Sequence, residues 1–266
     1  MLYALLKEDY KIKQFFRFLL KRSIRIDPSY YVTILLTLAL FSILSHITGF
    51  NGERIPFVPG QFIAHLFYAV PFTHYQPYNH VFWTLFVEFQ FYLIIGTLYF
   101  ISSNNWYRVV FIAAFSLTCF IPVPNSYYMV TSYAPIFGAG MAMVTYFKNQ
   151  KIINLTLPGA LLLLIAFKLG IVIAIVIFLT MMVVLFFTLE IRFLKLLGDV
   201  SYSLYLTHPL VLIVFSGLLK KANINQNQHQ LISFVAELAS ALLFSYIFYK
   251  AIEKPTTDLS KKIVYK

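Results

Sequence analysis

Glu88 is the residue of this chain whose position most needs a chemical explanation. It lies in the run Trp83-Thr-Leu-Phe-Val-Glu-Phe-Gln-Phe-Tyr92, at the head of an apolar stretch that continues to about Phe100. An ionised side chain near the centre of a membrane helix costs about 2.5 to 3.5 kcal/mol, so it normally faces a bundle interior, a partner or a water-filled cavity. We therefore expect Glu88 to be catalytic, orienting a base or an acceptor group. The alternative is a structural carboxylate held by Tyr or Gln side chains.

His208 is the second catalytic candidate, because removing a proton from a reacting hydroxyl needs a base nearby. An expected helix N-cap at Ser201 or Tyr202 places His208 about 9 to 10 Å from the inner membrane surface. A hydrocarbon core of about 30 Å then separates His208 from Glu88 by more than 10 Å in depth. A direct pair between these two residues is not expected.

Both His208 and Glu237 also have structural interpretations. Pro209 frees a backbone carbonyl near Tyr205, and His208 could satisfy such a group. Glu237 is a carboxylate in the last apolar stretch with no motif around it. We interpret Glu237 as structural or as the partner of a basic residue.

Arg22 and Arg25 form a candidate anion site. They lie one helical turn apart in Lys11–Ile26, which is predicted to be a basic amphipathic helix at the inner membrane interface. Guanidinium groups bind phosphate oxygens in bidentate geometry. The alternative is that they set topology or contact lipid headgroups. Asp27 before Pro28 predicts a new helix start, so the chain should turn sharply there.

No metal site is expected from the histidines of the segment between residues 50 and 82. His65, His74 and His80 have spacings of nine and six, which match no compact metal-ligand pattern. The single cysteine, Cys119, excludes a disulfide framework.

The composition places these residues in a membrane protein. Hydrophobic residues make up 60% of the 266 residues, charged residues only 12%, and the mean hydropathy is +0.76. No water-soluble domain of this size has such a composition. The net charge of +11 suits anionic lipid headgroups or an anionic cytosolic ligand, and it implies no nucleic acid.

Apolar runs of about 20 residues predict an all-α, polytopic transmembrane helix bundle with about eight spans. The expected spans cover residues 30–49, 84–103, 106–121, 128–147, 155–167, 171–189, 202–219 and 231–251. They form one membrane-embedded domain, with a basic interfacial segment (1–29), a bundle (30–252) and a cytoplasmic tail (253–266). A short apolar piece, Gln61 to Val70, is too short to span and is expected to dip into the membrane or lie flat on it.

The distribution of charge favours eight spans with both termini in the cytoplasm. Cytoplasmic loops collect Lys and Arg. This topology leaves 17 of the 21 basic residues inside, and the outside holds only Arg54, Lys168, Lys220 and Lys221. Seven spans would put the C-terminal lysines on the wrong side.

Four sequence blocks resemble acyltransferase family 3, the multi-pass membrane acyltransferases that move acetyl and other acyl groups onto cell-surface sugars. Lys21-Arg-Ser-Ile-Arg-Ile-Asp-Pro-Ser-Tyr30 is similar to R-R-x-x-R-I-x-P-x-Y, and the block around Glu88 to W-S-L-x-V-E-x-Q-F-Y. Leu197-Gly-Asp-Val-Ser-Tyr-Ser-Leu-Tyr-Leu-Thr-His-Pro209 is similar to L-G-x-x-S-Y-x-x-Y-L-x-H-P, and Ile252-Glu-Lys-Pro255 fits the family's ending. The blocks occur in the family's order over nearly the whole chain.

The resemblance implies a two-sided site. Acyl-CoA, with acetyl-CoA the first expectation, would enter from the cytoplasm and be held by Arg22 and Arg25. The acceptor, a saccharide or glycolipid, would enter from outside. Three aromatic members of the blocks are expected to contact substrates, namely Trp83, Tyr92 and Tyr202. For Trp83 the alternative is anchoring at the membrane interface, because it falls at a predicted span end. The expected location is the plasma (inner) membrane, with membrane lipids as further partners and a homo-oligomer as one possible assembly.

Part of the family pattern is absent. Family members usually have ten spans, and the first carries a His thought to be the catalytic base. This chain has neither the first nor the second span, because Met1–Tyr10 is similar to the connector that follows the second. The expectation is an upstream start, a truncated gene or a partner that supplies those helices, which leaves the activity of the chain alone open.

Two classes of function are therefore carried forward. The first is an acyltransferase using acyl-CoA. The second is a transporter or lipid-handling scaffold, since polar residues inside a bundle also mark permeation routes. No inverted repeat supports the second class, and a fragment that folds without acting alone is a third possibility.

Overall fold

The computed structural model describes residues 10–46, 55–98, 105–149, 155–186, 191–221 and 230–263. Within these ranges every regular element is helical, which confirms the predicted all-α membrane bundle. The chain divides into two compact units. Unit 1 comprises residues 1–19, 84–189 and 265–266, and unit 2 comprises residues 20–83 and 190–264.

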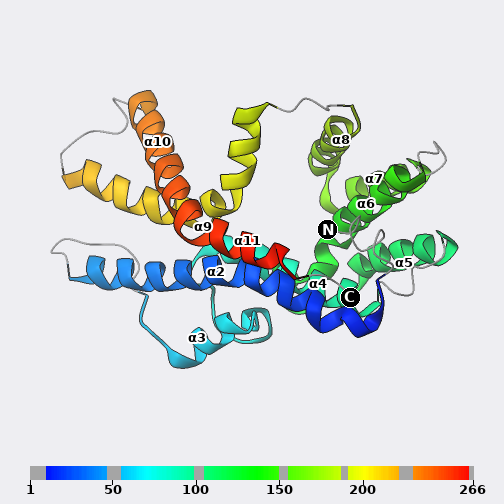
Figure 1. Cartoon of the computed structure of the whole chain (residues 1–266), viewed down its shortest axis with the longest axis horizontal. Helices are drawn as coiled ribbons and strands as arrows, with labels where there is room; N and C mark the ends of the chain where they lie inside the picture. Colours follow the sequence, from blue (N-terminus) through cyan, green and yellow to red (C-terminus); the bar gives the residue numbers. More distant parts are fainter. Residues whose placement is uncertain are drawn as a thin grey trace. The chain divides into compact units, whose positions relative to one another are not determined.

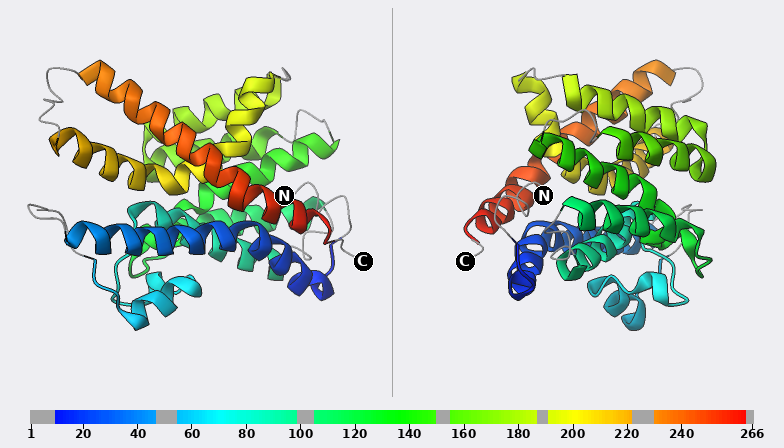
Figure 2. Two further views of the ribbon diagram at one scale, coloured as in Figure 1. Left: turned by 60° about the vertical axis from the view of Figure 1, so that its left-hand side comes forward. Right: turned by 90° about the vertical axis from the view of Figure 1, so that its right-hand side faces the viewer.

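Unit 1 is built from helices that pack on their neighbours in chain order, α5 on α6, α6 on α7 and α7 on α8 (Figure 2). Gly138 lets α5 and α6 approach closely, because a Cβ at this position would collide with the Ser116 hydroxyl. The elements are η1 (Ile12–Gln14), α4 (Trp83–Leu98), α5 (Asn105–Leu117), η5 (Thr118–Phe120), η6 (Ser126–Tyr128), α6 (Val130–Asn149), α7 (Thr156–Leu169) and α8 (Ile171–Phe186).

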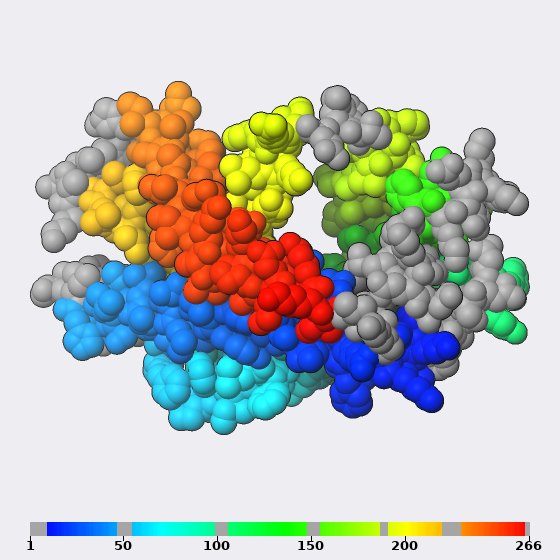
Figure 3. All heavy atoms as spheres, in the orientation of Figure 1, coloured from blue at the N-terminus to red at the C-terminus, as the bar shows by residue number. Residues whose placement is uncertain are grey.

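Unit 2 contains most of α2, which begins at Phe15, and the helices that end the chain. Figure 1 shows α10 and α11 as one continuous rod, joined by a π-helical turn. The red surface of α11 lies against the blue surface of α2 in Figure 3, where Lys21 Nζ donates to Ile263 O over 3.1 Å. The elements are α2 (Phe15–Ser45), α3 (Pro59–Leu66), η2 (Val70–Phe72), η3 (His80–Phe82), α9 (Arg192–Lys221), α10 (Gln230–Phe248), η8 (Tyr249–Glu253) and α11 (Lys254–Lys261).

Each of the eight predicted spans overlaps a helix of the described chain, α2 or one of α4 to α10, and residues 47–49, 99–103 and 187–189 of the predicted spans lie outside the described residues. Four helical stretches are long and apolar enough to cross a bilayer, namely Ile12–Ser45, His80–Leu98, Arg192–Leu219 and Gln230–Lys261. Three shorter apolar helices are Trp106–Phe120, Thr156–Leu169 and Ile171–Phe186. The count of eight spans and the side of each loop stay predictions.

The predicted helix start at Asp27 is wrong. Residues Phe15–Ser45 form one helix with Pro28 inside it, so the chain does not turn between an interfacial helix and a span. The Asp27 carboxylate accepts a hydrogen bond from the Tyr68 hydroxyl over 2.8 Å. The acceptor that could have capped a new helix is used in a tertiary contact, and the helix continues through the proline.

The segment that contains α3 packs beside the middle of α2. Tyr31 donates its hydroxyl proton to Leu66 O over 2.9 Å, and the Tyr30 and Tyr68 rings stack with centroids 5.0 Å apart. Tyr30 precedes Ser45, the last residue of α2, by about 22 Å along the helix axis at about 1.5 Å per residue. The segment therefore lies beside the middle of α2. Whether it dips into the membrane or lies flat on it stays a prediction.

Candidate functional site

Glu88 lies on α4 in unit 1 and is half-buried. Its Oε1 accepts a hydrogen bond from the Tyr92 hydroxyl one turn later. Tyr92 is itself buried, and its ring meets the Phe18 ring edge to face with centroids 6.2 Å apart. The structural alternative for Glu88, a carboxylate held by a tyrosine, is thus present. Within the described chain no protein group donates to Oε2.

Gln90 explains why the block around Glu88 needs an amide. Its Nε2 donates to Tyr128 O over 2.8 Å, and its Oε1 accepts from the Val130 backbone N–H over 3.0 Å. Tyr128 is the last residue of η6 and Val130 the first residue of α6, so Gln90 joins α4 to the N-terminus of α6, where backbone N–H groups have no helical partners. In this block Gln90 therefore holds structure, as Tyr92 does through its bond to Glu88.

Arg25, Tyr202 and Glu253 come together in unit 2 from three distant parts of the chain. Tyr202 on α9 donates its hydroxyl proton to Ile26 O over 3.2 Å, one residue after Arg25. Arg25 is exposed and lies close enough to attract the Glu253 carboxylate electrostatically. Arg22 is half-buried one turn away. We call Arg22, Arg25, Tyr202, Ser203 and Glu253 the arginine–glutamate cluster.

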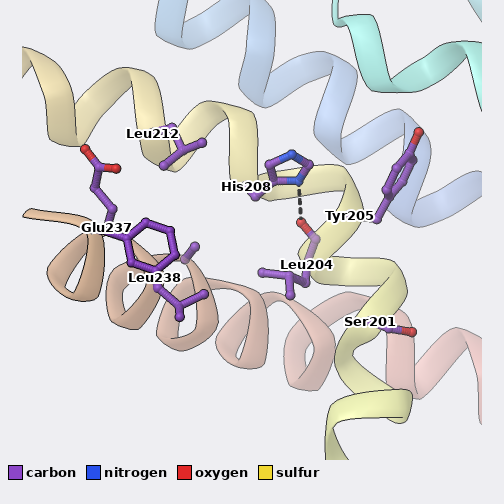
Figure 4. Close-up of a pocket in the computed structure, with 9 residues that line it drawn as sticks. Ser201, Leu204, Tyr205, His208, Leu212, Glu237 and Leu238 are labelled. Carbon is purple, nitrogen blue, oxygen red and sulfur yellow. Dashed lines mark hydrogen bonds between the residues drawn. The ribbon is translucent and has the colours of Figure 1, made fainter. Parts of the chain in front are cut away.

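Glu253 is, with Ser203, a member of this cluster that the sequence analysis did not single out. It is 5% exposed, and its Oε2 accepts both from the Ser203 backbone N–H over 3.1 Å and from the Ser203 hydroxyl. It ends the π-helical turn η8, and such turns are frequent at functional sites. A buried carboxylate that takes a backbone N–H from inside a helix disturbs the helical hydrogen-bond ladder. Accordingly, α9 changes direction between Ser201 and His208 (Figure 4).

His208 lies near the middle of α9, because the helix begins at Arg192. The predicted N-cap at Ser201 or Tyr202 is therefore wrong, and the depth derived from it does not hold. The block Gly198-Asp-Val-Ser201 continues an existing helix instead of starting one. Glu88 belongs to unit 1 and His208 to unit 2.

A cavity of about 490 Å³ opens beside His208 between α9 and α10 (Figure 4). We call it the His208 cavity. Its walls are mostly apolar, and Glu237, for which the sequence suggested a structural role, is its only carboxylate among the described lining residues. The lining residues are Ser201, Leu204, Tyr205, His208, Leu212, Phe234, Glu237, Leu238 and Ala241.

The hydrogen bond of His208 fixes which ring nitrogen carries the proton. Nδ1 lies 3.0 Å from Leu204 O, and a carbonyl oxygen can only accept, so Nδ1 is the donor. In the neutral ring Nε2 then carries a lone pair, and no side chain of the described residues donates a hydrogen bond to it. His208 therefore makes the backbone contact of its structural interpretation and still keeps a base.

A second group of polar residues surrounds the contact of α3 with α2. His65 is fully buried, accepts the Tyr78 backbone N–H at Nε2 over 3.2 Å, and lies 2.8 Å from the Tyr30 hydroxyl at Nδ1. Because Nε2 must accept, Nδ1 carries the proton of the neutral ring. Burial lowers the pKa of His65 from 6.5 to about 4. Burial, and then the negative charge of Asp27, raises the pKa of Tyr68.

The predicted site residues thus fall into separate groups. Arg22, Arg25 and Tyr202 are brought together, Glu88 pairs with Tyr92 four residues later, and Trp83 begins α4 directly after η3. Ser203 and Glu253 were missed as site residues although both lie in the quoted blocks. The sequence signalled only the glutamate of the Ile252-Glu-Lys-Pro255 ending. Its pairing with Ser203 follows from the fold and could not be predicted from either block.

Comparison with known proteins identifies the chain's family. The family model Acyl_transf_3, described as an acyltransferase domain, matches residues 2–250. The chain therefore belongs to acyltransferase family 3. No curated protein and no solved structure matches the chain.

Proposed function

We propose that this member of acyltransferase family 3 moves an acyl group from acyl-CoA to a hydroxyl of a saccharide or glycolipid outside the cytoplasm. Acetyl is the acyl group and the plasma membrane the location that we propose. Family membership supports a membrane acyltransferase in general. The donor, the acceptor and the residue roles are our inference from the described side chains.

The arginine–glutamate cluster supports the donor site. Arg25 is exposed, so its guanidinium can reach phosphate oxygens of a cytosolic ligand, while Glu253 attracts it from the buried side. Tyr202 fixes the neighbouring turn of α2 through Ile26 O.

The chemistry requires a base, a nucleophile and a leaving group. The acceptor oxygen attacks the thioester carbonyl carbon, the C–S bond breaks, and an ester and free CoA form. His208 Nε2 takes the proton of the attacking hydroxyl and returns it to the departing thiolate. Glu88 stays the second catalytic candidate, because within the described chain no group donates to its Oε2.

One observation carries the proposal. Three of the blocks that resemble the family meet within one compact unit. They lie at residues 21–30, 197–209 and 252–255, and the contacts of Tyr202, Ser203 and Glu253 join them. Blocks with only a spanning role would need no such polar contacts. The polar meeting point includes the arginine proposed to bind the donor.

The test uses His208→Gln with a matched histidine control. His46 also donates from Nδ1 to the carbonyl four residues earlier, Ser42 O at 2.7 Å, and it is exposed at the end of α2. Membranes containing the chain, with any coding sequence that precedes Met1, receive acetyl-CoA labelled in the acetyl group and a panel of glycans. We expect His208→Gln to lower transfer by about 100-fold or more and His46→Gln to leave it unchanged. Equal transfer by both variants would remove His208 from the mechanism, and solute flux without covalent transfer would favour a transporter.

A further inference from the structure

A second cavity in unit 2 has a different chemical character from the His208 cavity. It encloses about 470 Å³ between the C-terminal half of α2, residues 55–81 and the middle of α9. Because amide side chains dominate its polar surface, we call it the amide cavity. Its lining comprises Thr37, Phe41, Ile55, Pro56, Gln61, Gln76, Pro77, Tyr78, Asn79, His80, Val81, Pro209, Leu210 and Ile213.

The polar lining suits a neutral ligand. Gln61, Gln76 and Asn79 offer both donors and acceptors, as sugar hydroxyls do. No lining residue within the described chain is Asp, Glu, Lys or Arg. Among the described lining residues only the exposed His80 can carry a positive charge, so a carboxylate in the buried part of the cavity would find no permanent opposite charge, which costs several kcal/mol. Apolar faces of Tyr78 and Phe41 complete a surface of the kind that binds small organic molecules.

Asn79 points specifically to a missing partner. It is 8% exposed, and its Oδ1 accepts the Val81 backbone N–H over 3.3 Å at the start of η3. Because the Val81 N–H can only donate, the amide atom that it contacts is the oxygen. The amide nitrogen therefore points away from Val81. That nitrogen, Nδ2, is buried and has no hydrogen-bond partner in the described chain. This nitrogen is closed off from the cavity as well as from solvent, so a ligand oxygen would reach it only after the amide turned toward the cavity. The bond then formed would offset the cost of about 1 to 3 kcal/mol that a buried donor without a partner carries.

The cavity adjoins the helix that carries the proposed base. Pro209, the residue after His208, forms part of its wall, and Tyr205 donates its hydroxyl proton to Val81 O over 2.8 Å. Both residues belong to the Ser-Tyr-x-x-Tyr-Leu-x-His-Pro block. The block therefore builds one wall of the amide cavity as well as the His208 cavity.

We propose that the amide cavity is the acceptor subsite and that it selects an uncharged sugar ring, with Asn79 Nδ2 donating to one of its oxygens. The acceptor role rests on the proposed function, whereas the binding of a neutral sugar does not. The volume, which lies within the usual range of about 300 to 1,000 Å³ for ligand sites, accommodates a sugar ring.

The test compares Asn79→Asp with Gln230→Glu. The first keeps the oxygen that caps Val81 and removes the donor. The second makes the same amide-to-acid change at an exposed position at the start of α10, outside the cavities described above. Gln76→Ala, at an exposed lining residue, is the second cavity variant in case Asn79→Asp does not fold.

Binding is measured first, without donor, by saturation-transfer NMR on the chain in lipid nanodiscs. The probes are the methyl glycosides of galactose, mannose and N-acetylglucosamine, and methyl glucuronide as the charged comparison. We expect neutral signals that fall about fivefold in Asn79→Asp, fall in Gln76→Ala and persist in Gln230→Glu, with no glucuronide signal. No neutral signal from the unaltered chain, an equal glucuronide signal, or neutral signals insensitive to both cavity variants would overturn the proposal.

Transfer kinetics then separate this inference from the proposed function. We expect Asn79→Asp to raise the acceptor KM about fivefold while the KM for acyl-CoA stays unchanged. Sugar binding that depends on Asn79 without any acyl transfer would reject the acyltransferase and keep the subsite. Acyl transfer with an acceptor KM that neither cavity variant changes would reject the subsite and keep the acyltransferase.

Discussion

The buried imidazole of His65 makes the stability of unit 2 depend on pH in a way that can be calculated. Nε2 accepts the Tyr78 N–H and Nδ1 contacts the Tyr30 hydroxyl, so a second proton on the ring would break the bond to Tyr78. The pKa is about 4 in the folded protein and 6.5 ordinarily. As the pH falls below 6.5, His65 becomes protonated in the unfolded chain but stays neutral in the folded chain until the pH approaches 4.

The stability contributed by neutral His65 is therefore complete above pH 6.5 and is lost as the pH falls to 4. A tenfold difference in proton affinity corresponds to about 1.4 kcal/mol, so the free energy of unfolding should fall by about 3 kcal/mol between pH 7 and pH 4 from this residue. Other groups also titrate in this interval, so the expected quantity is the difference between the unaltered chain and His65→Gln.

The assay is denaturant unfolding in mixed micelles at a series of pH values. His65→Gln, which has no titrating ring, should show a pH dependence smaller by about 3 kcal/mol than the unaltered chain, whatever its stability at pH 7. His74→Gln removes an exposed histidine of the same segment and should keep the full dependence. Identical pH profiles for the unaltered chain and His65→Gln would refute the assignment of a neutral, buried ring.

Three further predictions concern the proposed site. Glu253→Ala leaves the buried Ser203 donors without their acceptor and should lower the free energy of unfolding by about 2 to 4 kcal/mol. Glu253→Gln keeps an acceptor and should lower the free energy of unfolding by less than half as much. Equal losses for the two variants in denaturant titrations would contradict this. Arg25→Ala should raise the KM for acyl-CoA about tenfold or more without changing the acceptor KM, and Arg192→Ala, at the exposed start of α9, should change neither. Tyr92→Phe removes the hydroxyl that donates to Glu88 and should reduce transfer less than Glu88→Gln does. The reverse order would mean that Glu88 only positions Tyr92 and takes no part in transfer.

The helices could be predicted from the sequence because a membrane permits few alternatives. A backbone in lipid must satisfy its own hydrogen bonds, so each apolar run of the required length becomes a helix. The runs beginning near residues 84, 171 and 231 accordingly coincide with α4, α8 and α10. The family resemblance was also readable, since the blocks around Glu88 and His208 keep their order and spacing.

The errors arose where a tertiary contact used a group that the local pattern assigned elsewhere. Asp27 resembled a cap, but its carboxylate binds Tyr68, which lies 41 residues later. Ser201 resembled a cap, but the helix had already begun at Arg192. No local pattern contains the partner in such cases, so the sequence alone cannot show which use prevails.

Glu253 illustrates the same limit for the site. Its importance follows from a π-helical turn and from a bond to Ser203, 50 residues earlier. The ending Ile252-Glu-Lys-Pro255 signalled a glutamate but not its partner. Likewise, Asn79 carries no motif, and only the buried, unpartnered Nδ2 within a cavity draws attention to it.

The central claim is that an acyl group passes covalently from CoA to a sugar. Inside-out membrane vesicles containing the chain, supplied outside with acetyl-CoA labelled in its acetyl carbon and loaded with glycans inside, test it most directly. The account predicts ester-linked label on the enclosed glycan and one free CoA released outside for each ester formed. Label that stays on CoA, or that enters the vesicles without joining a glycan, would contradict it.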